Sequence, residues 1–163
     1  MDLSFDIMNS EGDQIMVALS YYDYEAISIF TTDRSTLTLV FYDVTLVRKV
    51  GEGYVGYKVL FAISDILAKF MYENEDAVLC FYCDANTEVR RNHKNMLPQE
   101  YRSVLFSRMF ELYTKTHNIT NFINHRVEIV NPDNPNNRQF AHFICRTEHH
   151  EAVVSLGQIL MEK

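Results

Sequence analysis

"LVRKVGEGYVGYKVLF", from Leu46 to Phe61, holds three of the chain's five glycines, Gly51, Gly53 and Gly56. The residues before the glycines are rich in Val, Thr, Phe and Tyr, which favour strands. The apolar residues after them recur at a period of about 3.6, which is typical of an amphipathic helix. The stretch therefore predicts a strand that passes through a glycine-containing connection into a helix.

The residues upstream of this stretch predict a meander of four strands. These strands are rich in β-branched and aromatic side chains, and they cover residues 3–9, 14–21, 26–32 and 36–49. The glycine-containing "SEGD" between the first two strands predicts a hairpin turn.

The residues downstream predict three helices and three further strands. The helices follow the glycines, run from Pro98 to Thr116, and close the chain from Glu151. The apolar stripe of the second helix is Tyr101, Val104, Leu105, Met109, Leu112 and Tyr113. The apolar run "AVLCFYC", residues 77–83, predicts a strand buried on both faces. Residues 121–130 and 138–146 predict a hairpin around "NPDNPNN".

The predicted order of elements is ββββαβαββα. Because strands do not alternate strictly with helices, the fold class is α+β, with a mixed, mainly antiparallel sheet and helices packed on it. With 163 residues, 47% of them apolar, the chain is expected to form a single domain over residues 1–163.

The composition excludes several classes of protein. No apolar run approaches the roughly 18 residues of a membrane-spanning helix, and the first residues lack the pattern of a signal peptide. We therefore expect a cytoplasmic protein that does not enter a membrane. The net charge of −7 disfavours nucleic acid as a partner.

The three cysteines, Cys80, Cys83 and Cys145, are an odd number, which favours free thiols over a disulfide framework. Cys80 and Cys83 form C-x-x-C, but on a strand this spacing sends the two side chains to opposite faces. We expect buried structural thiols and no metal site.

The glycines between strand and helix have two interpretations. Main-chain amides at a helix start have no partner within the helix and face the positive end of its dipole, and glycine lets them turn toward an anion. Alternatively, the glycines only connect a strand to a helix. The candidate anion-binding residues are Arg48, Lys49, Val50, Gly51, Gly53 and Tyr54.

The stretch "RKVGEG", residues 48–53, resembles the R/Q-x-x-G-x-G/A loop of the GNAT acetyltransferases, and the order of elements over residues 14–146 is similar to that family. The resemblance implies a GNAT-like fold with acetyl-CoA as cofactor, its pyrophosphate held by amides around Gly51 and Gly53. It also implies direct acyl transfer to an amine on a small molecule or a protein. Tyr101, nearer the helix start than Tyr113, would protonate the leaving thiolate. The two early helices of that family are not predicted here.

A locally basic segment surrounds the start of the second predicted helix. Arg90, Arg91 and Arg102 are candidate phosphate ligands, because a guanidinium fork binds phosphate at two points. The phosphate would belong to CoA or to RNA, or else these side chains pair with the acidic N-terminal third. Residues 90–113 also resemble the core of a family of small, uncharacterised bacterial proteins, which implies a bacterial origin.

His125 and His142 fall on the two strands of the final hairpin, where they could be neighbours across the ladder, and we expect a structural role for both. No carboxylate or thiol at ligand spacing completes a metal site around them.

Three functions remain open. The first is an acyl-CoA-dependent N-acyltransferase or a CoA-binding GNAT-like protein. The second is a non-catalytic interaction or regulatory module, whose aromatic side chains would contact a protein partner. The third is a small, toxin-like protein that acts on nucleic acid.

Overall fold

The computed structural model describes residues 3–8, 14–21, 27–30, 36–50, 57–83, 97–130, 132–134 and 137–161. The chain divides into two compact units, residues 1–80 and 81–163, with the boundary inside strand β5. The predicted α+β class and the predicted order of strands and helices are confirmed. The single domain stays a prediction.

The first unit is built on strands in the hydrogen-bonded order β1, β2, β4, β5. Their bounds are Leu3–Met8, Gln14–Tyr21, Thr36–Val50 and Ala77–Cys83. The pairs β1–β2 and β2–β4 are antiparallel, whereas β4 and β5 run parallel from Val40 opposite Ala77 to Asp43 opposite Cys80. The sheet is therefore mixed and mainly antiparallel, as predicted.

Strand β4 pairs antiparallel with both β2 and β3 at different points along its length. Strand β3 (Ile27–Phe30) pairs with its first residues, and β2 pairs with its later part. Tyr21 lies opposite Tyr42, and Ile27 lies opposite Leu39. Because both are antiparallel to β4, β2 and β3 run in the same direction, so they are not successive antiparallel strands of a meander.

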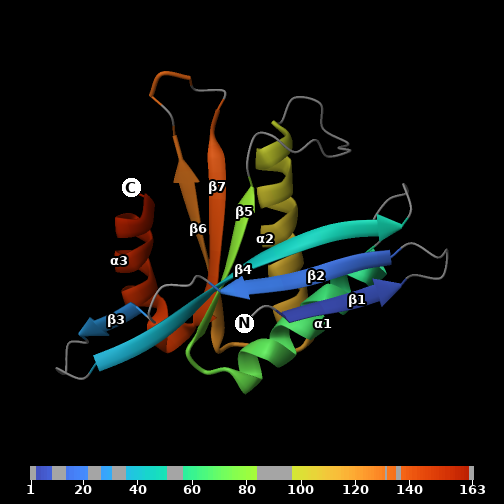
Figure 1. The fold of residues 1–163 in the computed structure, drawn as a ribbon, viewed down its shortest axis with the longest axis horizontal. Coiled ribbons are helices and arrows are strands. Elements are labelled where there is room, and N and C mark those ends of the chain that lie inside the picture. Colours follow the sequence, from blue (N-terminus) through green and yellow to red (C-terminus); the bar gives the residue numbers. More distant parts are fainter. Residues whose placement is uncertain are drawn as a thin grey trace. The chain divides into compact units, whose positions relative to one another are not determined.

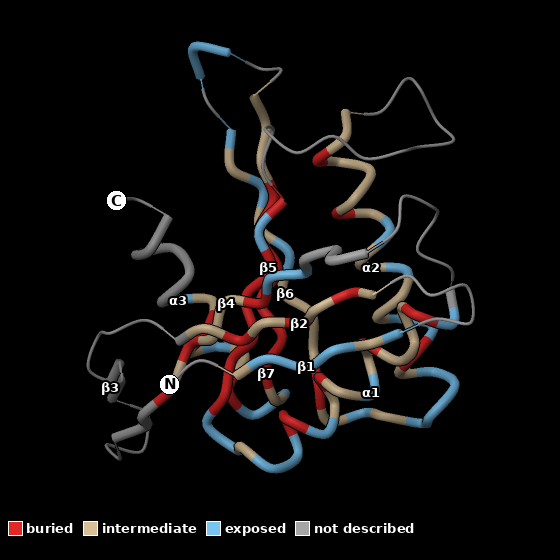
Figure 2. The backbone as a smooth tube through the Cα atoms, turned by 45° about the vertical axis from the view of Figure 1, so that its right-hand side comes forward, coloured by how far each residue is buried: buried red, intermediate tan, exposed pale blue. Residues whose placement is uncertain are grey.

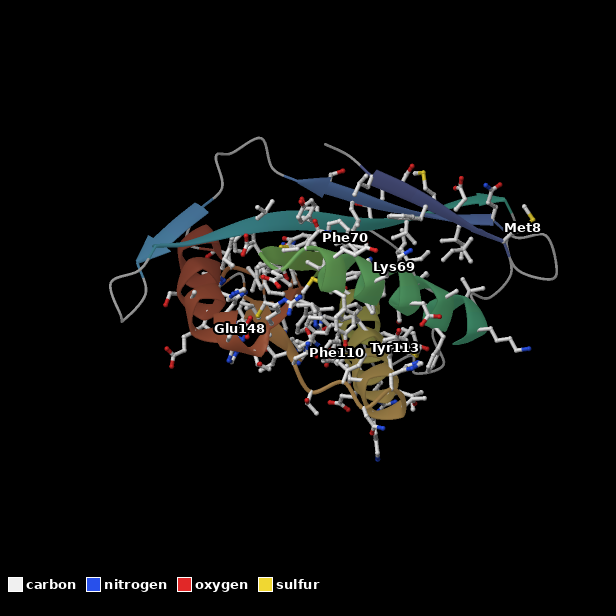
Figure 3. The ribbon with its side chains drawn as sticks, turned by 90° about the horizontal axis from the view of Figure 1, so that it is seen from below. Met8, Lys69, Phe70, Phe110, Tyr113 and Glu148 are labelled. Carbon is white, nitrogen blue, oxygen red and sulfur yellow. The ribbon has the colours of Figure 1, made fainter. Side chains whose placement is uncertain are left out.

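Helix α1 (Tyr57–Glu73) lies against the sheet of the first unit and returns the chain from β4 to β5 (Figure 1). The ring of Phe70 meets that of Tyr42 on β4 edge to face, with 4.9 Å between ring centroids. Figure 3 shows Phe70 directed toward the strands, while Met8 lies at the far end of β1. Burying such an apolar side chain contributes about 2 kcal/mol. The buried residues of α1 are Val59, Ile63, Leu67, Phe70 and Met71.

In the second unit, the end of β5 is followed in the sheet by β7 and then by β6. Strand β6 (Phe122–Ile129) pairs antiparallel with β7 (Gln139–Arg146). Strand β7 is buried over six successive residues, which Figure 2 shows as a continuous buried segment. Strand β7 therefore forms the centre of the core of this unit.

Helices cover both faces of the β6–β7 hairpin (Figure 1). Helix α2 (Pro98–Thr116) packs on β7. The short 3₁₀-helix η1 (Thr147–His149) leads into α3 (His150–Met161), which packs on β6 and β7. Among the described residues, no helix is long and apolar enough to cross a membrane.

The face that α2 buries is not the predicted one. Leu105 and Leu112, both in the predicted apolar stripe, are exposed, whereas Gln99 and Ser103 are 2% and 0% exposed. Tyr113 is buried as predicted. The stripe is partly wrong because the two polar side chains have hydrogen-bond partners in the folded second unit, which offset the cost of burying them.

Candidate functional site

The end of β4 carries an irregularity at the predicted anion site. Gln14 lies opposite Val50, but the next residue, Ile15, lies opposite Arg48, so Lys49 has no counterpart on β2. A residue inserted in this way bends its strand, and such bulges are frequent beside functional sites. The chain therefore leaves the regular ladder two residues before Gly51.

The connection after β4 belongs to a parallel crossover. Strand β4 ends at Val50, α1 begins at Tyr57, and β5 then pairs parallel with β4. The carboxyl end of such a strand, next to a helix start, is where open α/β sheets bind ligands, and the helix dipole there attracts anions. The first turn of α1 carries no acidic side chain, and Lys58 within it is exposed. Nothing in that turn neutralises the positive helix end.

The predicted site residues lie in different parts of the chain, and the structure describes only some of them. Arg48, Lys49 and Val50 form the end of β4, with only their backbone described. Tyr101 and Arg102 lie in the first turns of α2, where Tyr101 N–H donates to Leu97 O at 2.9 Å. The Nε atom of Arg102 is buried. The residues that lie outside the described ranges are Gly51, Gly53, Tyr54, Arg90 and Arg91.

The second unit contains a chain of hydrogen bonds that links α2 to β6 and β7. Ser103 Oγ lies 2.7 Å from His142 Nε2 and accepts a 2.7 Å hydrogen bond from Arg126 Nε. His142 Nδ1 lies 3.1 Å from Asn124 Oδ1, and Asn124 Nδ2 donates to Ser107 Oγ at 3.5 Å. Ser103 and His142 have no exposed surface. These five side chains are called the His142 chain below.

Simple periodicities bring the His142 chain together. Arg126 lies directly opposite His142, and Asn124 lies two residues earlier on β6, so the three side chains share one face of the hairpin. Ser103 and Ser107 are four residues apart on α2 and therefore lie on one side of the helix. The helix side and the hairpin face meet at His142.

The hydrogen bonds determine where the protons lie. Asn124 Oδ1 can only accept, so His142 Nδ1 carries the proton and donates to it. His142 Nε2 then has to accept, and Ser103 O–H is its donor. Ser103 Oγ in turn accepts from Arg126. Each of these contacts then has one donor and one acceptor, and His142 is neutral.

The surroundings of His142 keep it neutral. Burial, and next the positive charge of Arg126, lower the pKa of His142 from 6.5 to about 4. Both causes disfavour an imidazolium, because a second cation would be desolvated beside a guanidinium. Protonation would also remove the acceptor that Ser103 uses.

Part of the chain resembles a catalytic triad in the order of its hydrogen bonds. Ser103 stands in the place of the nucleophile, His142 in that of its base, and Asn124 in that of the group that orients the base. Two observations argue against that chemistry. Neither Ser103 nor His142 is exposed, so an acyl substrate has no approach. In addition, Ser103 Oγ accepts from a cation, and a base with a pKa of about 4 is weak at neutral pH. The chain therefore orients groups and does not attack a substrate.

His125 and His142 are not cross-strand neighbours, although the spacing allowed it. His125 lies opposite Phe143, and His142 lies opposite Arg126, so the two histidines point to opposite faces of the hairpin. His125 packs against His150 of α3, with 5.4 Å between ring centroids. Burial and then His150 lower the pKa of His125. A shift of one residue in register separates what the spacing could have placed together.

The cysteines are free and buried, as predicted. Burial, with a smaller contribution from Asp43, raises the pKa of Cys80 well above its usual value, and burial raises that of Cys145 to about 12. Both thiols are therefore protonated and unreactive at neutral pH. Within the described ranges, no group of three or more His, Cys, Asp or Glu side chains could hold a metal ion.

Comparison of the chain with protein-family models, curated proteins and solved structures found no match. The candidate sites therefore stand on their own geometry.

Sequence reasoning missed Ser103, Asn124 and Arg126. The one signal available was the pair of serines at helical spacing on a helix whose partner strand, "QFAHFICR", is apolar at its centre except for its histidine. A lone polar side chain on a buried strand needs partners, and serine and asparagine can supply them. Which serine meets the histidine depends on how the helix packs, which local spacing does not determine.

Ser103→Ala should lower the free energy of unfolding by about 2–3 kcal/mol, because it leaves His142 Nε2 and Arg126 Nε without a partner. Ser107→Ala is the matched control on the same helix side, and it should cost less than about 1 kcal/mol because its hydrogen bond is long. Urea unfolding measures both. Equal losses for the two variants would contradict the central place of Ser103.

Acid should destabilise the protein through His142. The pKa of His142 rises on unfolding from about 4 toward 6.5, so the unfolded chain binds more protons and stability falls as the pH drops from about 6.5 to 4. The contribution is of the order of 3 kcal/mol. In the His142→Gln variant this part of the pH dependence of stability should vanish. The part due to His125 should remain in both the wild type and the variant. Unfolding free energies from pH 4 to 7.5 test this, and parallel profiles would refute it.

Proposed function

We propose that the protein is a cytoplasmic acyl-CoA-dependent N-acyltransferase, with acetyl-CoA as its cofactor. The observation that carries the proposal is that β4 ends at Val50 and α1 begins at Tyr57 within a crossover to a parallel strand, so the stretch 48–53 starts at the carboxyl end of β4. The bulge at Lys49 and the absence of acid from the first turn of α1 support an anion site there.

The chemistry of that position suits a diphosphate. Unpaired amides at a helix start donate to phosphate oxygens, and the helix dipole adds a favourable field. Glycines at residues 51 and 53 allow close approach and φ > 0, so successive amides can face one ligand. The resemblance of residues 48–53 to the GNAT loop supplies the identity of the ligand, with Arg48, Lys49, Val50, Gly51, Gly53 and Tyr54 around its pyrophosphate.

The same resemblance assigns Tyr101 as the general acid that protonates the departing CoA thiolate. The acceptor is an amine on a small molecule or a protein. Tyr101 is partly buried in the first turn of α2, and a phenol O–H is a donor of the kind that this role requires.

A second candidate function is a protein-interaction module. Leu105 and Leu112 lie two turns apart on one face of α2, and they are 36% and 48% exposed. Apolar side chains in such a position favour contact with a protein partner. This function requires no cofactor, so the ligand experiment separates it from the first.

Acetyl-CoA at about a hundred times its dissociation constant should raise the melting temperature by about 5–10 °C, since it adds about 2.7 kcal/mol to stability. Gly53→Glu should abolish the rise, because a carboxylate would occupy and repel the anion site. Gly12→Glu, the same change in another glycine-containing connection, should retain it. No response to any acyl-CoA would remove the cofactor, and a rise retained in Gly53→Glu would move the site elsewhere.

Tyr101→Phe should leave the affinity for acetyl-CoA unchanged and lower the rate of acetyl transfer by about 10²-fold, because only proton transfer to the leaving group is lost. The assay is release of CoA thiol with a mixture of amines and polyamines as acceptors, and Tyr113→Phe is the matched control on the same helix. If both variants transfer at the wild-type rate, Tyr101 is not the acid.

A further inference from the structure

Arg126 is held in one orientation by the second unit. Its Nε donates to Ser103 Oγ at 2.7 Å, and its guanidinium carbon lies 4.4 Å from the centre of the Phe140 ring. Phe140 is fully buried, so the surface on which the guanidinium rests is rigid. Arg126 itself is exposed and reaches solvent from β6, the last strand of the sheet. Much of the entropy cost of ordering this side chain is therefore met before any ligand arrives.

A second arginine on the same ring provides a comparison. The guanidinium carbon of Arg138 lies 5.6 Å from the centre of the Phe140 ring, and its Nε donates to Glu128 at 2.6 Å in an ion pair. Arg126 forms no ion pair with any residue that the structure describes. Glu128, two residues along the same face of β6, is occupied by Arg138. Of two arginines beside one ring, only Arg138 has a counter-ion among the described residues.

The His142 chain orients Arg126 without neutralising it. Its other members are two serines, an asparagine and a neutral histidine. The charge of Arg126 remains strong enough to lower the pKa of His142 as the second cause after burial. The guanidinium is thus an oriented and uncompensated positive charge at the surface of the described part of the chain.

We propose that Arg126 is the centre of an oxyanion-binding site at the edge of the second unit, where it takes a carboxylate or phosphate group. Since Ser103 occupies Nε, the ligand binds end-on, with one oxygen on Nη1 and another on Nη2. The site lies wholly on α2, β6 and β7, so it is independent of the proposed acyl-CoA site at the β4–α1 connection.

The test is an NMR titration of the full chain with phenyl phosphate and with benzoate, which share a ring and differ in the anion. Amide signals of β6 near residue 126 should shift, and Arg126→Met should weaken binding at least about tenfold, the value of one charge-assisted contact. Arg126→Lys keeps the charge but loses the fork, so a smaller, several-fold loss is expected. Arg108→Met removes an exposed arginine from α2 and should bind as the wild type does.

Binding of phenyl phosphate alone identifies a phosphate site, and binding of benzoate alone identifies a carboxylate site. Either result supports the proposal if the Arg126→Met substitution weakens binding of that probe. Equal affinity in wild type and Arg126→Met overturns it. So does the absence of any wild-type response up to about 50 mM of either probe, where a millimolar site would be saturated. An unchanged amide spectrum outside β6 and α2 shows that each variant is folded.

Discussion

The parallel pairing of β4 with β5 is the constraint on which the first unit depends. Antiparallel strands can be joined by a short turn, but parallel strands require a crossover of a dozen residues or more, usually a helix. Residues 44–76 make that crossover, and α1 is its helix. The start of α1 must then follow the carboxyl end of β4. In the sequence the glycines fall between the carboxyl end of β4 and the start of α1, which makes this connection the best candidate for an anion site.

The second unit depends on a different kind of interaction. Strand β7 is buried over six successive residues, and apolar contacts alone would let α2 slide along it with little cost. His142 removes that freedom, because both of its ring nitrogens need partners in fixed directions. Ser103 of α2 and Asn124 of β6 supply them. We infer that the His142 chain selects one placement of α2 on the hairpin, at the cost of burying polar groups that must all be paired.

Sequence patterns predicted the elements of this fold well, and they predicted its contacts poorly. Continuous apolar runs, Pro98 and the glycines mark where elements begin and end, and these are local properties of the chain. The buried face of α2 depends instead on distant partners, so Leu105 was misplaced and Ser103 was overlooked. The face of a histidine depends on strand register, so the spacing could not show that His125 and His142 point to opposite faces. The bulge at Lys49 likewise depends on how β2 and β4 pair, so the sequence of β4 alone did not predict it.

Arg126 and His142 are coupled, and the coupling has a direction. After burial, the positive charge of the Arg126 guanidinium is the second cause that lowers the pKa of the His142 imidazole. An oxyanion bound to Nη1 and Nη2 would balance that charge and raise the pKa of His142. By linkage, protonation of His142 and occupation of Arg126 then favour each other, since each lowers the cost of the other's charge. Ser103 bridges the two side chains, because its Oγ contacts both Arg126 Nε and His142 Nε2. The coupling therefore acts over a short distance within one unit. At the proposed site, a buried histidine that attacks nothing would therefore make oxyanion binding depend on pH.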